Sequence, residues 1–348
     1  MKTTDQAITT QSNLAIQRLT ALWAFSESAL GGVLHALQVP FTGLIVGGFA
    51  IIILTLIAWF AQGDLKKIFT SLLIVLIIKA TVSPYTPLPA YIAVSFQGLM
   101  AFLLFRLMGI NYISILLLSV ITLFESALQK LLILTFFFGQ SIWTAADKIV
   151  GSIAGQLKMQ TNNGSLLIIG VYLLIHFITG ILLSFFIYRL VKTISTRKIS
   201  EEMPAIIGIS PELMIKKKKR KNRSAIIMIG LLIVISVILF VFARDTKQGL
   251  TAVARSVAWT LLAMLSWYSL SPYLLKGIRK FLSKKESTVA NHVSDILAVF
   301  PVLNQLVFAA WKKSAEQKNI RRLPFFISTI INWTLISPGI ENNNPTRK

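Results

Sequence analysis

Cysteine is absent from this 348-residue chain, and acidic residues are scarce, with 13 Asp and Glu against 35 Lys and Arg. The lack of cysteine excludes disulfides, thiolate metal ligands and thiol nucleophiles. Charged residues of both signs make up only 14% of the chain, whereas soluble domains carry about 25%. The composition is therefore not that of an ordinary soluble protein.

The common catalytic and metal-binding motifs are missing as well. There is no glycine-rich loop ending in Gly-Lys-Ser or Gly-Lys-Thr, which excludes nucleotide hydrolysis by the P-loop route. There is also no HExxH pair, no GxSxG elbow and no cluster of Asp residues of the kind that holds magnesium. With three histidines in all, the sequence predicts no cofactor and no structural metal site.

Hydrophobic residues, in contrast, make up 55% of the chain, and the mean hydropathy is +0.71. They form continuous runs, and about 20 such residues in a helix cross the ~30 Å hydrocarbon core of a bilayer. The runs do not alternate with polar residues as the strands of a membrane barrel would. Because a helix satisfies its own backbone hydrogen bonds, the sequence predicts an all-α, polytopic transmembrane helical bundle.

About eight spans are predicted, six followed by two. They run at about 18–38, 42–61, 68–82, 91–108, 112–138, 165–190, 225–243 and 255–273. The first is the least hydrophobic, and without it the N-terminus would lie on the other side of the membrane. The third is short, and the fifth is long enough to be tilted or broken.

The net charge of +22 invites a nucleic-acid interpretation, but the basic residues lie at the ends of spans. With eight spans, every basic cluster falls on one side, as expected for the cytoplasmic side. The clusters are Lys66 with Lys67, Arg106, Arg189 with Lys192, the run from Lys216 to Arg223, and that from Lys276 to Lys285. We therefore expect a cell (inner) membrane protein with both termini cytoplasmic, a lipid bilayer around it and no nucleic-acid partner.

Changes in composition predict four regions. Residues 1–191 form a six-span bundle, 192–224 a basic cytoplasmic linker, 225–273 a two-span hairpin and 274–348 a basic amphipathic cytoplasmic tail. Apolar residues at helical spacing from Val293 to Trp311 predict an amphipathic helix on the membrane surface or against a partner. The apolar block at 323–333 is short for a span and is expected to lie in the interface.

Polar residues inside the spans are the candidate binding groups, because ionisable side chains at membrane depth usually face a bundle interior or a cavity. The predicted solute-binding residues are Glu27, His35, Gln97, Glu125 and His176. The alternative is that they form hydrogen bonds between helices while Lys79 and Lys130 extend to the interface. Taken as a set, we interpret them as a polar pocket for a small solute.

The first span carries small residues at every fourth position, which allow another helix to approach closely. They are Ala24, Ser28, Gly32 and Ala36. Their role is either packing within the bundle or docking of a separate membrane subunit, and spacing alone does not separate the two. A second feature is the loop Ser83–Pro89, where three prolines predict a rigid, non-helical connection on the outer side.

Over about residues 18–190, these features resemble the substrate-binding S-component of energy-coupling factor (ECF) transporters. The segments that carry the resemblance are Leu30–Gly43 and Ser83–Gly98. It implies capture of a vitamin-like or small organic solute from outside, followed by toppling of the bundle against a separate transmembrane coupling subunit driven by two ATPase subunits. The face from Ala24 to Ala36 would be the docking face. Unlike S-components, which end near the sixth span, this chain continues.

The leading hypothesis is thus a non-enzymatic component of a small-solute uptake system that depends on partner subunits for energy. One alternative is a membrane-embedded enzyme of lipid or isoprenoid metabolism, with Glu27, His35 and Glu125 as acid or base groups. The other is a non-catalytic membrane assembly or scaffold protein whose working parts are the basic tail and its amphipathic helix.

Overall fold

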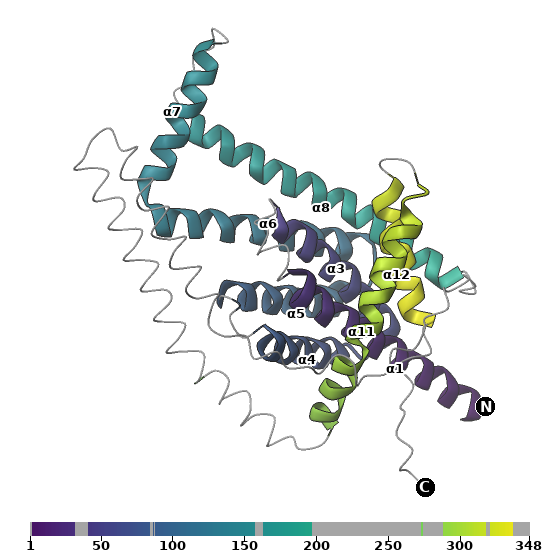
Figure 1. Ribbon diagram of the computed structural model, residues 1–348. Helices are drawn as coiled ribbons and strands as arrows, with labels where there is room; N and C mark the ends of the chain where they lie inside the picture. The colour runs from purple at the N-terminus through teal and green to yellow at the C-terminus, as the bar shows by residue number, and fades with distance from the viewer. Residues whose placement is uncertain are drawn as a thin grey trace. The chain divides into compact units, whose positions relative to one another are not determined.

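The computed structural model describes residues 2–31, 41–83, 86, 88–156, 163–196, 273, 288–317 and 321–336, which contain helices and no strand (Figure 1). The helices are α1 (Lys2–Phe25), η1 (Ser26–Leu30), α3 (Thr42–Ala61), α4 (Lys66–Val82), α5 (Leu88–Met108), α6 (Tyr112–Phe138), α7 (Gln140–Gln156), α8 (Gly164–Thr196), α11 (Thr288–Ser314) and α12 (Arg322–Ile336). The predicted all-α class is confirmed for these residues.

Five helices in the described part of the chain are long and apolar enough to cross a membrane. They cover Thr42–Ala61, Leu88–Met108, Tyr112–Phe136, Gly164–Ile194 and Val293–Ser314. Only 11% of the most apolar stretch of α8 is buried within the protein, and its exposed side chains include Leu182 and Phe185. An apolar surface of this size is typical of contact with a membrane or a partner. The chain is therefore compatible with a multi-pass membrane protein.

Four of these helices, α3, α5, α6 and α8, correspond to predicted spans. The predicted span at 68–82 is α4, a helix of 17 residues that is not among the five. The predicted first span differs more, because α1 begins at Lys2 instead of near residue 18, and its polar first half keeps it out of the five. The predicted spans at 225–243 and 255–273 lie outside the described residues, apart from Tyr273.

By its internal contacts the chain divides into two compact units. One comprises residues 1–127, 173–209 and 277–348, and the other comprises 128–172 and 210–276. In the first unit α3 is the central helix, since 72% of its most apolar stretch is buried and it packs against α1, α4 and α5. Gly98 of α5 faces Leu72 of α4 so closely that a Cβ at this position would lie 2.8 Å from a leucine methyl.

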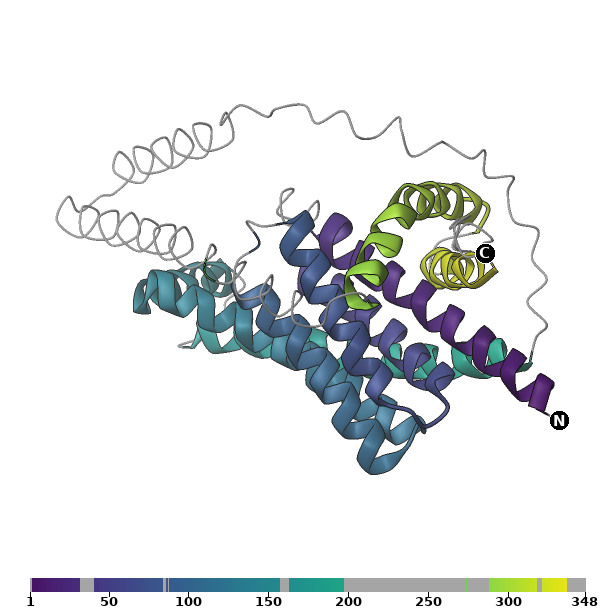
Figure 2. The same cartoon turned by 90° about the horizontal axis from the view of Figure 1, so that it is seen from below.

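The helices α11 and α12 pair with each other and pack against α1 (Figure 2). The ring centroids of Phe300 in α11 and Phe25 in α1 are 5.3 Å apart. Arg18 of α1 donates a hydrogen bond to the carbonyl of Leu335 in α12. The buried face of α11 consists of Ile296, Val299, Leu303, Leu306 and Ala310. The predicted amphipathic helix is present, but its apolar face is buried in the core of its own chain. This differs from the predicted position on the membrane surface or against a partner.

Candidate functional site

The helix α1 continues into the π-helical turn η1, where the backbone N–H of Gly31 donates to the carbonyl of Ser26. Such a turn holds one residue more than an α-helical turn and is frequent at functional sites. Ser26, Glu27 and Ser28 are all buried here. The Ser26 hydroxyl donates to the carbonyl of Trp23 at 2.8 Å, which fixes its side chain against the preceding turn.

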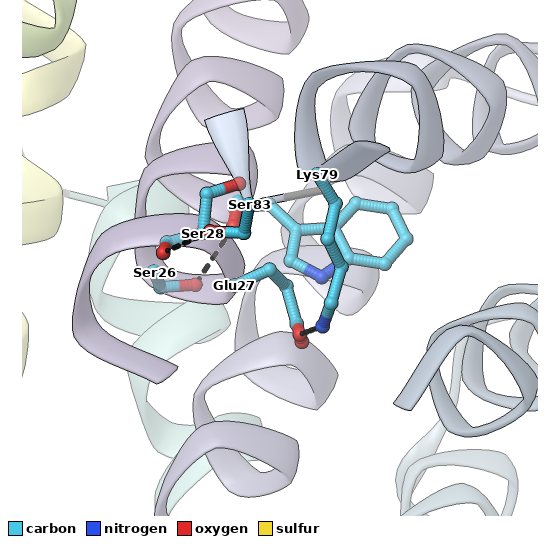
Figure 3. Close-up of polar contacts among 6 residues, drawn as sticks. Ser26, Glu27, Ser28, Lys79 and Ser83 are labelled. Atoms are coloured by element: carbon cyan, nitrogen blue, oxygen red, sulfur yellow. Dashed lines mark hydrogen bonds and ion pairs between the residues drawn. The ribbon is translucent and has the colours of Figure 1, made fainter. Parts of the chain in front are cut away.

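Glu27 of η1 forms a buried ion pair with Lys79 in the last turn of α4 (Figure 3). The Lys79 Nζ lies 2.6 Å from Glu27 Oε2, and the two residues are 4% and 5% exposed. Beside the pair, the Ser83 hydroxyl donates to the carbonyl of Ser28 at 3.1 Å, so α4 is tied to η1 twice. The alternative in which Lys79 extends to the interface does not hold, because its ammonium is paired with Glu27 inside the bundle.

Buried oxygen atoms without a hydrogen-bond partner among the described residues include, at this end of the bundle, the Ser28 hydroxyl and two oxygens that can only accept a hydrogen bond. One is Glu27 Oε1, the second oxygen of the ion-paired carboxylate, and the other is Gln97 Oε1 on α5. More than nine in ten buried polar groups in proteins are hydrogen-bonded, so each exception requires an explanation such as a bound molecule. Both oxygens can accept a hydrogen bond from a ligand or from water.

Glycines on the first turns of α3 allow the polar residues of α5 and α6 to come close. A Cβ on Gly47 would lie 3.4 Å from Gln97 Nε2, and a Cβ on Gly43 would lie 2.2 Å from the hydroxyl oxygen of Ser126. Glu125, the residue before Ser126 on α6, is half-buried, and we include it in this region by its position in the chain.

His176 of α8 reaches the beginning of the same helix. Its side chain is 1% exposed, and its ring centroid lies 6.0 Å from that of Phe41, the residue that precedes α3. Phe41 has a φ of 62°, a left-handed conformation in which the chain turns into α3. η1 also contacts α3, and a Cβ on Gly31 would lie 3.9 Å from Val46.

We call this region the polar end. It consists of η1, residues 41–47 at the beginning of α3, and the side chains of Lys79, Gln97, Glu125, Ser126 and His176. Of the five predicted binding residues, Glu27, Gln97, Glu125 and His176 belong to it, although they come from four separate segments of the chain. The fifth, His35, lies outside the described residues.

Of the four predicted docking residues, two lie within the described residues and two lie outside them. Ala24 and Ser28 are 0% and 4% exposed, so both are buried within the chain, as packing in the bundle requires. Gly32 and Ala36 lie outside the described residues. Sequence reasoning had also overlooked Lys79 as the partner of Glu27. The signal for this pair was available, because the two are charges of opposite sign in otherwise apolar segments.

Comparison of the chain with protein-family models, curated proteins and solved structures finds no match.

Proposed function

We propose that this protein is the solute-binding membrane component of a small-solute uptake system, that it binds its solute at the polar end, and that it depends on partner subunits for energy. The observation that carries the proposal is the convergence of polar side chains from η1, α4, α5, α6 and α8 on the first turns of α3. Independent interhelical hydrogen bonds would be expected at scattered positions along the helices.

The unpaired oxygens support the same proposal. Leaving a buried acceptor without a donor costs about 1–3 kcal/mol, and more for a charged group. Glu27 Oε1 and Gln97 Oε1 both bear this cost in the described part of the chain. A solute that donates hydrogen bonds to them would recover it, which is the usual way in which a preformed polar site gains affinity.

The predicted orientation places the polar end on the outer side. The polar end includes the C-terminal ends of η1 and α4 and the N-terminal end of α3, so it adjoins the connections 31–41 and 83–88. In the proposed arrangement of eight spans with both termini in the cytoplasm, these two connections are extracytoplasmic. A site at this end suits the capture of a vitamin-like or small organic solute from outside the cell membrane.

The sequence carries no P-loop, so uptake driven by ATP would need partner subunits to supply the energy. We propose a transmembrane coupling subunit and ATPase subunits as these partners. The coupling subunit would use a surface other than the stretch of Ala24 and Ser28, which the chain itself buries.

The test is to purify the full chain from its native membranes and identify bound small molecules and co-purifying subunits by mass spectrometry. A Gln97→Leu variant serves as the impaired form. Thr55→Val serves as the matched control, because Thr55 is a buried polar residue on α3 whose hydroxyl donates within its own helix, to Ile51 O at 2.9 Å. We expect one solute enriched with wild type and Thr55→Val and depleted with Gln97→Leu. Equal small-molecule content in all three would contradict the proposal.

A further inference from the structure

The Glu27–Lys79 pair has unused hydrogen-bonding capacity on both partners. Glu27 accepts from Lys79 through Oε2, while Oε1 is unpaired within the described ranges. A lysine ammonium carries three donors. Among the residues that the structure describes, Lys79 donates to Glu27 alone, so two of its N–H groups are spare. A spare acceptor therefore lies next to spare donors.

The pair is also neutral as a unit, with one negative and one positive charge 2.6 Å apart in a buried setting. Each charge compensates the other, which is what makes their burial tolerable. A solute with a net charge would leave one charge at the pair uncompensated, and an uncompensated buried charge is strongly unfavourable. A solute with no net charge avoids this penalty.

The pair lies close to the surface of the bundle end. Leu30, three residues after Glu27, is 38% exposed, and Val82, three residues after Lys79, is 43% exposed. Three residues of helix advance about 4.5 Å along the axis. The pair is thus about one helical turn from these exposed residues, and the hydrogen bond from Ser83 to the Ser28 carbonyl joins the same two helix ends.

Building on the proposed function, we propose that the solute carries no net charge and presents a hydrogen-bond donor beside an acceptor, with the donor bound to Glu27 Oε1 and the acceptor to Lys79 Nζ. Two kinds of molecule have this chemistry. One is a zwitterion with an ammonium and a carboxylate, as in a neutral amino acid, and the other is an uncharged amide or lactam. The Glu27–Lys79 pair is then the group that selects for charge.

The experiment uses the full chain in phosphatidylcholine nanodiscs and measures binding by calorimetry with five pools of compounds. The pools are neutral amino acids, uncharged amides and lactams, dicarboxylates, phosphate monoesters and polyamines. We expect binding in the first or the second pool, and which of the two responds identifies the zwitterion or the amide. Binding confined to the dicarboxylate, phosphate or polyamine pools would overturn the charge rule and leave the proposed function standing. No binding in any pool would contradict the proposed function and this inference together.

Two variants separate recognition from a purely structural ion pair. The exchanged double variant Glu27→Lys/Lys79→Glu keeps two opposite charges but reverses their positions. We expect it to keep its melting temperature and to bind the wild-type solute at least tenfold more weakly. Glu27→Gln leaves the Lys79 ammonium without its counter-charge, so we expect it to gain at least tenfold in affinity for dicarboxylates. If both variants retain wild-type affinity and selectivity, the pair is structural and the inference is wrong.

Discussion

At the scale of single residues, the most informative contact is the ion pair between Glu27 and Lys79, which are 5% and 4% exposed. A buried ion pair contributes little net stability compared with apolar residues of the same volume, because both charges have lost their hydration. Removing one partner is different, since the other charge then stays buried without compensation. The effect of a substitution at either position on stability therefore depends on the residue at the other position.

We predict that Lys79→Met lowers the free energy of unfolding by about 3–5 kcal/mol. The double variant Lys79→Met/Glu27→Gln should recover most of this loss, because it no longer buries a lone carboxylate. Reversible unfolding in mixed detergent micelles measures both values. Equal losses in the single and the double variant would show that the charge of Glu27 is not what destabilises the single one.

A second prediction at this scale concerns Asp147 in α7, whose Oδ1 accepts from the backbone N–H of Ser165 at 2.6 Å, at the beginning of α8. This hydrogen bond favours the ionised carboxyl and holds the pKa of Asp147 below its ordinary value of 3.8. A depressed pKa means that the bond stabilises the fold above the unfolded pKa of about 3.9 and is lost as the pH falls through the lower folded value.

The amide proton of Ser165, followed by NMR, should therefore keep its chemical shift from neutral pH down to about pH 4 and change only below that value. Asp147→Asn should remove this titration. A midpoint at or above 3.8 in the wild type would contradict the proposed bond.

At the scale of elements, close helix contacts depend on particular glycines. Gly180 of α8 faces α6, and a Cβ there would lie 3.0 Å from the Cα of Val120 and 3.2 Å from its backbone nitrogen. Backbone atoms cannot rotate away as a side chain can, so the helices would have to separate. Gly170, on the same helix, has nothing within 4 Å of its hypothetical Cβ.

We predict that Gly180→Ala destabilises the protein by about 1–3 kcal/mol through overpacking. Gly170→Ala should be neutral, or stabilising by up to about 1 kcal/mol, because alanine has the higher helix propensity. Thermal unfolding of the two variants beside the wild type gives the comparison. Equal melting temperatures of the two variants would contradict the prediction.

The sequence predicts elements well where one long apolar run decides the structure, as in α3 and α8. It misplaces the beginning of α1, because the polar residues after Lys2 carry no hydrophobic signal for a helix. It also does not predict η1, since a π-turn depends on tertiary contacts such as the bond from Ser83 to the Ser28 carbonyl. The burial of α11 against α1 is likewise non-local: the periodicity gives its apolar face but not what covers that face.

For the candidate residues, too, the sequence predicts one part of the result and not the other. Glu27, Gln97, Glu125 and His176 could be selected from sequence because polar groups inside apolar segments are rare and costly. That they converge on the first turns of α3 could not be predicted. It depends on glycines at 43 and 47, whose role appears only when α5 and α6 pack against them.

At the scale of the whole molecule, we propose a membrane-spanning bundle whose polar end faces outward. Five helices of sufficient length and apolar character support the membrane part. We infer the orientation from the positions of basic residues, since Lys66 and Lys67 adjoin one end of α3 and the polar end adjoins the other. Labels at opposite ends of the same helix should therefore report opposite sides of the membrane.

The most direct test is cysteine labelling in intact cells followed by purification of the chain, in which no native cysteine competes with the introduced thiol. Asn163→Cys, just before α8, should react with a membrane-impermeant maleimide added outside. Asp64→Cys, an exposed position between α3 and α4, and Lys218→Cys in the basic linker should react only after the membrane is permeabilised. Labelling of Asp64→Cys and Lys218→Cys from outside, with Asn163→Cys protected, would invert the bundle and contradict an outward-facing solute site.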